Sequence, residues 1–126
     1  MRVFKTKGFG RFAKSESISN EMLAKSIRQA ETGLVDADLG AGLVKLRVAR
    51  KGQGKRGGYR TLIAYRSGER AVFLFGFAKS ERDNVSAEQL ADLKSAAVDI
   101  LRRSDDDIAE DIAAGRLLEV DYDEGD

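Results

Sequence analysis

Apolar residues recur every three or four positions in the first third of the chain. They form two series, from Phe9 to Ala13 and from Ile18 to Ala30, after a short strand candidate that Val3-Phe4 opens. A period near 3.6 is typical of amphipathic helices. Gly33 follows the second series, and glycine readily adopts the left-handed conformation in which many helices end. We therefore expect a short strand and then two helices in this part of the chain.

The apolar period changes to two in the middle of the chain. Residues 43–49 and 59–65 alternate between two faces, and in the first segment Lys45 and Arg47 share the face opposite the apolar one. Residues 71–78 (AVFLFGFA) form an apolar run long enough for a strand that is covered on both faces. Successive strands with short connections predict an antiparallel meander.

Helical spacing returns in the last third of the chain. Ser86 and Gln89 stand at the spacing of a capping box before an apolar stripe, and Ser104 precedes three aspartates that open a second predicted helix. Consecutive residues of a helix point in different directions, so these aspartates favour helix capping over a cation site. Gly115 can end the second helix, and residues 117–120 are a candidate last strand.

Helices before and after an antiparallel sheet predict the α+β class. We expect a small sheet of about four strands, with the N-terminal and C-terminal helices packed on it, in one domain of residues 1–120. Residues 121–126 are mostly acidic, and we expect them to form a disordered tail.

The composition excludes several kinds of catalysis. The 126 residues include no cysteine and no histidine. Serine-histidine-aspartate hydrolysis, cysteine proteolysis and zinc catalysis are therefore excluded. No apolar run reaches the roughly 20 residues that span a bilayer. The first ten residues mix charges with aromatics and do not form a signal sequence, so we expect a soluble, cytoplasmic protein with no membrane partner.

The net charge of +1 hides a strong division of charge along the chain. Residues 1–42 carry a net charge of +2, residues 43–82 carry +9, and residues 83–126 carry −10. A basic central block is typical of a protein that binds a polyanion such as a nucleic acid. The acidic end prompts the hypothesis that residues 121–126 fold over the basic face and weaken RNA binding.

The basic residues of the central block form the main candidate site. Lys45 and Arg47 share one strand face, and Arg60 lies on the next predicted strand. Neighbouring strands lie about 4.8 Å apart, so these three cations can converge on one patch. Lys79 and Arg82 follow the third strand. Exposed cations also serve solubility, but repulsion among cations with few carboxylates nearby favours binding of a polyanion.

A glycine-rich basic loop is expected at residues 51–58 (KGQGKRGG), with Lys51, Lys55 and Arg56 as candidate RNA contacts. The loop does not match a Walker motif, because no Lys-Ser/Thr pair opens a helix after it. A flexible hairpin loop and a loop that grips a nucleic-acid backbone are equal alternatives at this point.

Three phenylalanines, Phe73, Phe75 and Phe77, alternate along the last strand of the meander, and we expect them to share one face. They are candidates for base stacking, but a strand this apolar favours a place in the core.

Three segments of the central block are distinctive in combination. They are LVKLR at residues 43–47, GQGKRGGYR at residues 52–60, and FGFAKSER at residues 75–82, which Asn84 follows. In this order they resemble the RelE/HigB toxin family of type II toxin-antitoxin systems, in particular its HigB-like branch, and the resemblance is best over residues 43–95. Members are small antiparallel-sheet proteins, and many cut messenger RNA in the ribosomal A site without a metal or other cofactor. The resemblance implies mRNA, the ribosome and a cognate antitoxin as partners, the antitoxin usually being a helix-turn-helix protein.

Metal-free RNA cleavage needs three kinds of group. One takes the proton of the attacking 2′-hydroxyl, one stabilises the dianionic phosphorane, and one protonates the leaving 5′-oxygen. The resemblance implies Arg60 and Arg47 as charge stabilisers, Lys45 as the candidate base and Lys79 as the candidate acid. Lys51, Lys55, Arg56 and Arg82 are the remaining candidate RNA contacts.

The chain departs from the family pattern at several positions. Arg47 stands where the best-known ribosome-dependent member has a lysine thought to act as base, and arginine does not deprotonate usefully. Ser80 and Ser86 stand where that member has an arginine acid and a stacking tyrosine. Glu81 is an alternative base, or it only pairs with Arg82. A non-catalytic nucleic-acid or ribosome binder and a ParE-like topoisomerase inhibitor are the alternative functions on the same scaffold.

Overall fold

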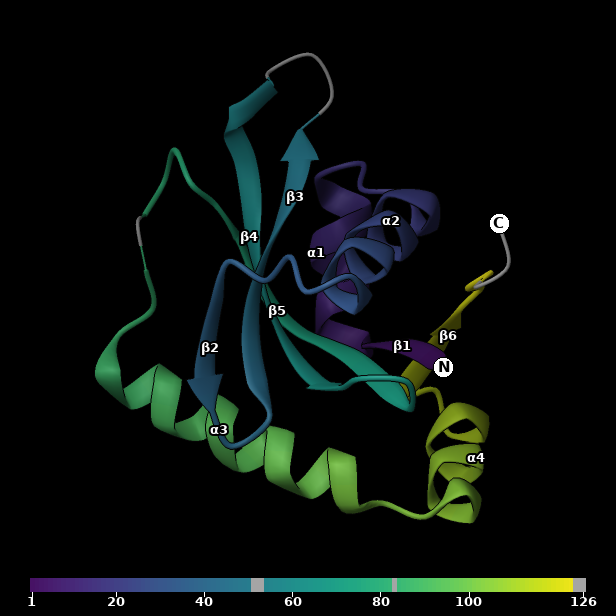
Figure 1. Ribbon diagram of the computed structural model, residues 1–126. Helices are drawn as coiled ribbons and strands as arrows, with labels where there is room; N and C mark the ends of the chain where they lie inside the picture. The colour runs from purple at the N-terminus through teal and green to yellow at the C-terminus, as the bar shows by residue number, and fades with distance from the viewer. Residues whose placement is uncertain (51–53, 83, 124–126) are drawn as a thin grey trace.

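The computed structural model describes residues 1–50, 54–82 and 84–123, with side chains for all of these except residues 50 and 54–57. These residues form six strands and four helices, shown in Figure 1. In chain order the elements are β1 (Arg2–Thr6), α1 (Lys7–Ser15), α2 (Asn20–Glu31), β2 (Ala37–Gly40), β3 (Leu43–Arg50), β4 (Gly54–Arg66), β5 (Arg70–Ala78), α3 (Ala87–Arg102), α4 (Asp105–Ala113) and β6 (Leu117–Val120). None of the helices in these ranges is long and apolar enough to cross a membrane.

The strands form one mixed sheet in the order β2-β3-β4-β5-β1-β6. β1 runs parallel to β5, and the other neighbouring pairs are antiparallel. The α+β class and the antiparallel meander of β3, β4 and β5 are confirmed. The predicted number of about four strands is too low. β1 inserts between β5 and β6, and the short β2 extends the opposite edge.

β4 is longer than the alternating pattern indicates. It begins at Gly54, so residues 54–58 of the predicted glycine-rich loop belong to a strand, while residues 51–53 lie outside the described residues. Gly58 permits a close approach of β4 to β3, since a Cβ at this position would lie 2.6 Å from the carbonyl oxygen of Val48. A residue with a Cβ would clash here, so the close approach of the two strands requires glycine.

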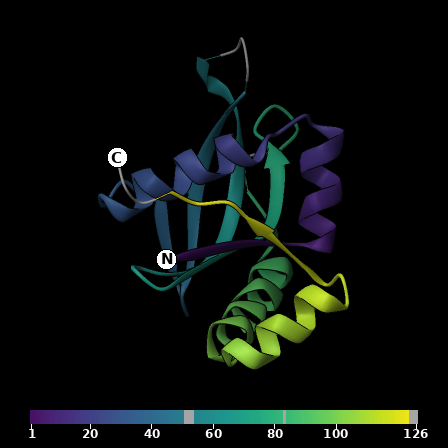
Figure 2. The same cartoon turned by 90° about the vertical axis from the view of Figure 1, so that its right-hand side faces the viewer.

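Helices cover both faces of the sheet (Figure 2). α1 packs against β5 and α2 against β3 on one face, and α3 packs against β4 and α4 against β6 on the other. The core beneath α1 and α2 includes Val3, Phe9, Leu23, Ile27, Val44, Leu46, Ile63 and Phe73. The core beneath α3 and α4 includes Phe4, Leu43, Leu62, Ala64, Val72, Ala97, Leu101, Ile108 and Leu117. The sheet is therefore the middle layer of three.

The helix boundaries follow the predicted capping signals. The Ser86 hydroxyl accepts a hydrogen bond from the backbone N–H of Gln89 at 3.1 Å, and the Gln89 side chain accepts one from the backbone N–H of Ser86 at 3.2 Å. Ser104 accepts a hydrogen bond from the backbone N–H of Asp107. Gly33 has a φ of +93° just after α2, in the left-handed region.

A β-bulge in β5 changes the predicted arrangement of its phenylalanines. Leu62 of β4 pairs with Phe75, but the next residue, Ile63, pairs with Phe73, so Leu74 is an extra residue in the ladder. Phe73 therefore packs beneath α1 and α2, whereas Phe75 packs on the α3 and α4 face. The prediction that Phe73, Phe75 and Phe77 share one face is wrong, because one inserted residue reverses the alternation.

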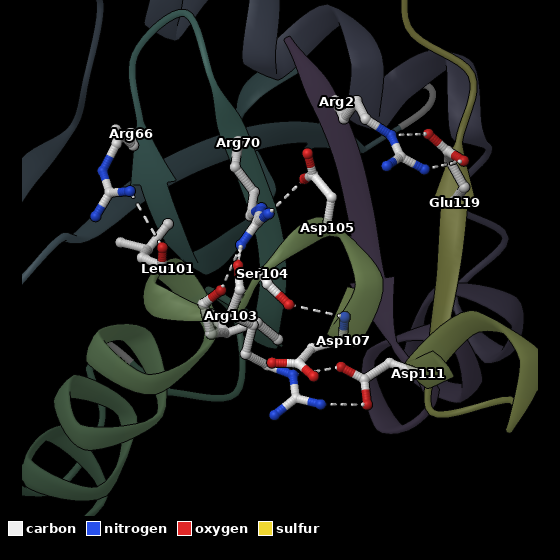
Figure 3. A network of polar contacts seen from close by, with 11 residues as sticks. Arg2, Arg66, Arg70, Leu101, Arg103, Ser104, Asp105, Asp107, Asp111 and Glu119 are labelled. Carbon is white, nitrogen blue, oxygen red and sulfur yellow. Dashed lines mark hydrogen bonds and ion pairs between the residues drawn. The ribbon is translucent and has the colours of Figure 1, made fainter. Parts of the chain in front are cut away.

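Arginines of β4 and β5 anchor the end of α3 to the sheet (Figure 3). Arg70 donates hydrogen bonds to the carbonyl oxygens of Ile100 at 2.9 Å and Arg103 at 2.8 Å, and Arg66 donates one to the carbonyl oxygen of Leu101 at 3.1 Å. The last carbonyls of a helix have no partner within the helix, so these arginines satisfy them and fix the end of α3 against the β4–β5 turn.

Asp111 closes this network from α4. Its carboxylate is 8 % exposed and accepts hydrogen bonds from Nε of Arg103 at 2.6 Å and from Nε of Arg116 at 2.9 Å. Burial alone would raise the pKa of the Asp111 carboxyl, but the hydrogen bonds from Arg116 and Arg103 outweigh burial and lower it. The ionised carboxylate is therefore the form that the fold stabilises.

Replacing Asp111 by Asn is expected to lower the free energy of unfolding by about 2 kcal/mol at pH 7. Because the pKa of this carboxyl is lower in the folded chain, its contribution is complete above about pH 4, the ordinary range of an aspartate, and is lost as the pH falls further. Urea unfolding at pH 7 and near pH 3 measures both effects. The difference between wild type and variant should shrink at the lower pH, and the exposed Asp92→Asn on α3 should show neither effect.

Candidate functional site

Two rows of side chains cross β3, β4 and β5 on the face that α3 partly covers. In the first row Arg47 pairs with Arg60, and Arg60 pairs with Phe77. In the second row Lys45 pairs with Leu62, and Leu62 pairs with Phe75. Side chains directly opposite in a sheet share a face. The predicted convergence of Lys45, Arg47 and Arg60 is therefore confirmed, and two aromatic rings border them on β5.

The second row, which contains Leu62, lies at the edge of the sheet area that α3 covers. Leu62 is fully buried in the core that includes Ala97 and Leu101 of α3. The first row lies two residues earlier in β4, toward the start of β4 and the end of β3, which rise above α3 in Figure 1. Lys45 is half-buried, and the side chain of Arg47 is 53 % exposed. The cations thus stand where the sheet leaves the cover of α3.

Arg60 is almost fully buried, which is unusual for an arginine. Its side chain is 5 % exposed, and its Nη1 is buried with no hydrogen-bond partner among the described residues. Burial and the charge of Arg47 lower the pKa of the Arg60 guanidinium, and Asp36 offsets this only in part. A buried charge without full hydrogen bonding costs free energy, so the fold keeps a strong donor ready for an anion.

A carboxylate that the sequence does not predict as part of the site lies beside the two arginines. Asp36 precedes β2, and its Oδ1 is 3.2 Å from Nε of Arg47 while its Oδ2 is 3.8 Å from Nε of Arg60. The backbone N–H of Asp36 donates to the carbonyl oxygen of Lys45 at 2.9 Å, which fixes the residue at the edge of β3. The sequence gives little sign of this position, because β2 is only four residues long and its residues ADLG have weak strand propensity.

Arg82 covers the aromatic side of the site. Its guanidinium carbon lies 6.0 Å from the ring centre of Phe75 and 5.8 Å from that of Phe77, and its Nη1 donates to Oε1 of Gln89 at 3.3 Å. Phe77 is buried, which confirms its predicted place in the core, and Phe75 is half-buried. A planar guanidinium over aromatic rings at the rim suits contact with a nucleobase.

The remaining predicted residues are distributed around this patch. Lys79 is exposed just after β5, and its backbone N–H donates to the carbonyl oxygen of Gly58 at 3.2 Å, which ties the start of that loop to β4. Glu81 is exposed. Lys51 lies outside the described residues, and Lys55 and Arg56 lie in β4 with their side chains outside the description. Their RNA contacts stay predictions.

The described part of the acidic tail starts on the other face of the sheet. Tyr122 packs against the core beneath α1 and α2, whereas Arg60 lies on the face of α3. Residues 124–126 lie outside the described residues. The hypothesis that the tail covers the basic face therefore gains no support from the path of the chain up to Asp123.

The sequence of this domain matches a known protein family along nearly its whole length. Residues 1–120 match the family described as RelE toxin of RelE / RelB toxin-antitoxin system. The chain belongs to the RelE toxin family. It is thus the toxin component of a toxin-antitoxin system, and a RelE toxin implies a cognate antitoxin. No curated protein matches the sequence closely enough to report.

The match to the RelE toxin family confirms the predicted resemblance and agrees with the mixed sheet between two helical layers. It is a match to the family as a whole, so the HigB-like branch stays a prediction. Among the candidate residues, the structure brings Lys45, Arg47 and Arg60 onto one patch.

Proposed function

We propose that this RelE-family toxin cleaves messenger RNA on the ribosome and so stops translation, as a metal-free endoribonuclease. The observation that carries the proposal is Arg60, a buried guanidinium with a donor that lacks a partner in the described part of the chain, in register with Arg47. RNA supplies the anion that such a pair binds, and the half-exposed Arg47 is the member of the pair that an approaching substrate reaches first.

The chemistry assigns each side chain a role. The 2′-hydroxyl of the RNA attacks the adjacent phosphorus, the bond to the 5′-oxygen breaks, and the products are a 2′,3′-cyclic phosphate and a 5′-hydroxyl. Arg60 and Arg47 stabilise the dianionic phosphorane. Lys45, one row away on the same face, takes the proton of the 2′-hydroxyl, and Lys79 protonates the leaving oxygen. Glu81 is the alternative base, and it is exposed on the loop after β5.

The partners of the proposed toxin follow from its family. The antitoxin is a helix-turn-helix protein in the HigB-like branch, and its gene is expected beside that of the toxin. Lys51, Lys55, Arg56 and Arg82 contact the RNA backbone and bases around the catalytic patch. Of these residues, Arg82 is the one whose side chain is described, and it lies over Phe75 and Phe77.

Controlled induction of the wild-type protein in bacteria tests this function. We expect growth arrest within minutes and new 5′-hydroxyl mRNA ends within translated codons, which mapping of RNA ends detects. Purified protein should then cut an mRNA in the presence of ribosomes stalled on it. Growth arrest with intact mRNA would instead indicate a non-catalytic ribosome binder, and a DNA-damage response with intact mRNA would indicate a topoisomerase inhibitor.

A further inference from the structure

Arg47 and Arg60 form an electrostatic conflict at the centre of the site. They lie directly opposite each other on adjacent strands, where two like charges destabilise a sheet. Arg60 is almost fully buried, so water screens the repulsion poorly. Within the described ranges, Asp36 is the carboxylate that forms an ion pair with either of them. The arrangement of the two arginines therefore depends on a residue that lies outside the meander.

Asp36 contacts the two arginines at their Nε atoms and leaves Nη1 of Arg60 buried without a hydrogen bond to any described residue. Its two oxygens face the Nε atoms, Oδ1 that of Arg47 and Oδ2 that of Arg60. Nη1 of Arg60 has no hydrogen-bond partner in the portion of the chain with described side chains. A guanidinium held at Nε keeps the outer edge of its fork for a second anion.

The backbone of Asp36 is held against β3. Its backbone N–H donates to the carbonyl oxygen of Lys45, so it moves with the edge of β3. It also contributes, with Arg47, to the wall of a hollow of about 520 Å³ between α2 and β3, whose apolar lining includes Leu34, Leu46 and Val48. The side chain of Asp36 is 23 % exposed. A carboxylate with a fixed backbone and limited exposure can hold two side chains in one orientation.

We propose that Asp36 is a positioning residue for RNA cleavage: its carboxylate bridges Arg47 and Arg60 through their Nε atoms and directs both guanidinium groups toward the scissile phosphate. The inference rests on the proposed function. It explains why a negatively charged side chain lies in a site that binds the negatively charged phosphate. Asp36 acts through the two arginines and does not exchange a proton with the RNA.

The substitution Asp36→Asn tests this role. Asparagine keeps the size of the side chain and one acceptor oxygen but removes the charge and the second acceptor. RNA affinity at low salt should rise slightly, because the site loses a negative charge. The cleavage rate at saturating RNA should fall about 10²-fold, as expected when a reacting group is misplaced by about 1 Å. The shape of the pH–rate profile should stay that of the wild type.

Asp38→Asn is the matched control. Asp38 lies two residues further on, in β2, is exposed, and accepts a hydrogen bond from the backbone N–H of Gly40 that asparagine can also accept. Asp38 pairs with Val44, so it lies on the opposite face of the sheet from the two arginines. This variant loses the same charge from β2 without touching either arginine, so its cleavage rate should stay that of the wild type. Asp36→Glu, which restores the charge, should recover part of the rate.

Two results would overturn the proposal. A cleavage rate that rises in Asp36→Asn would mean that the carboxylate occupies the place of the phosphate and inhibits the site. A lower rate together with loss of the acidic limb of the pH–rate profile would mean that Asp36 is the base.

A readout without RNA separates this inference from the proposed function. The Nε–H group of Arg47 donates a hydrogen bond to Asp36, and that of Arg60 lies 3.8 Å from its carboxylate. Both should give signals shifted by the carboxylate in the NMR spectrum of the wild type, and Asp36→Asn should lose these shifts while Asp38→Asn keeps them. If the wild type fails to cut RNA, the proposed function fails, and these signals still test the bridge. If they are absent from the wild-type spectrum, the bridge itself is wrong.

Discussion

Replacing Arg60 by Gln is expected to lower the rate of RNA cleavage by about 10²- to 10³-fold, the usual effect of removing one donor that stabilises a developing anion. The same substitution should leave the midpoint of thermal unfolding unchanged or raise it. The pKa of Arg60 is lowered by burial and by Arg47, which means that the fold disfavours its charged form. A shorter, neutral side chain removes that cost, and such a trade of stability for activity is typical of functional sites.

Two measurements decide the prediction for Arg60. The first is the single-turnover rate on an mRNA bound to ribosomes, and the second is thermal unfolding followed by circular dichroism. Arg11→Gln on α1 removes the same charge from an exposed side chain that has no ion pair or side-chain hydrogen bond to any described residue, and it should change neither value. If Arg60→Gln unfolds at a clearly lower temperature and keeps its cleavage rate, the arginine has a structural role and the site lies elsewhere.

Replacing Phe4 by Ala is expected to lower the free energy of unfolding by about 3–5 kcal/mol, which lowers the midpoint of thermal unfolding by roughly 10–20 °C. Phe4 has no exposed surface and belongs to the core beneath α3 and α4. It pairs with Val72 of β5 on one side and Glu119 of β6 on the other, so the cavity left by its ring cannot close without moving two strands.

A matched variant on the neighbouring strand controls for this effect. Leu118 of β6 is 42 % exposed, and Leu118→Ala should cost about 1 kcal/mol or less. Urea unfolding of both variants measures the difference. A loss of less than about 1 kcal/mol for Phe4→Ala would mean that β1 lies at the periphery and would contradict the insertion of β1 between β5 and β6.

The sequence predicts the elements whose signals are local. The alternation in residues 43–49 and 59–65 gives the strands that carry the site, and the serines at positions 86 and 104 mark the starts of α3 and α4. The parallel pairing of β1 with β5 leaves no such signal, because its partners are separated by about half the chain and no turn connects them. A strict period of two contains no sign of a bulge, so the sequence predicts one face for Phe73 and Phe75 although the structure separates them.

The sequence likewise predicts some residues of the candidate site and not others. Lys45, Arg47 and Arg60 are predictable because antiparallel neighbours joined by a short connection must bring the same faces together. Asp36 is not, since it precedes a four-residue strand and reaches the arginines only through the pairing of β2 with β3. The depth of Arg60 is also hidden from the sequence, because charged residues on a strand face ordinarily remain exposed.

The position of β1 in the sheet has a consequence for the synthesis of this toxin. β1 is made before both of its neighbours, because β5 ends at Ala78 and β6 spans Leu117–Val120. Until those residues have left the ribosome, one edge of β1 stays open, and an open strand edge invites pairing with other chains. A chain that stops before Leu117 therefore leaves this edge of β1 unpaired and prone to aggregation, and the sheet is complete only once β6 has been made.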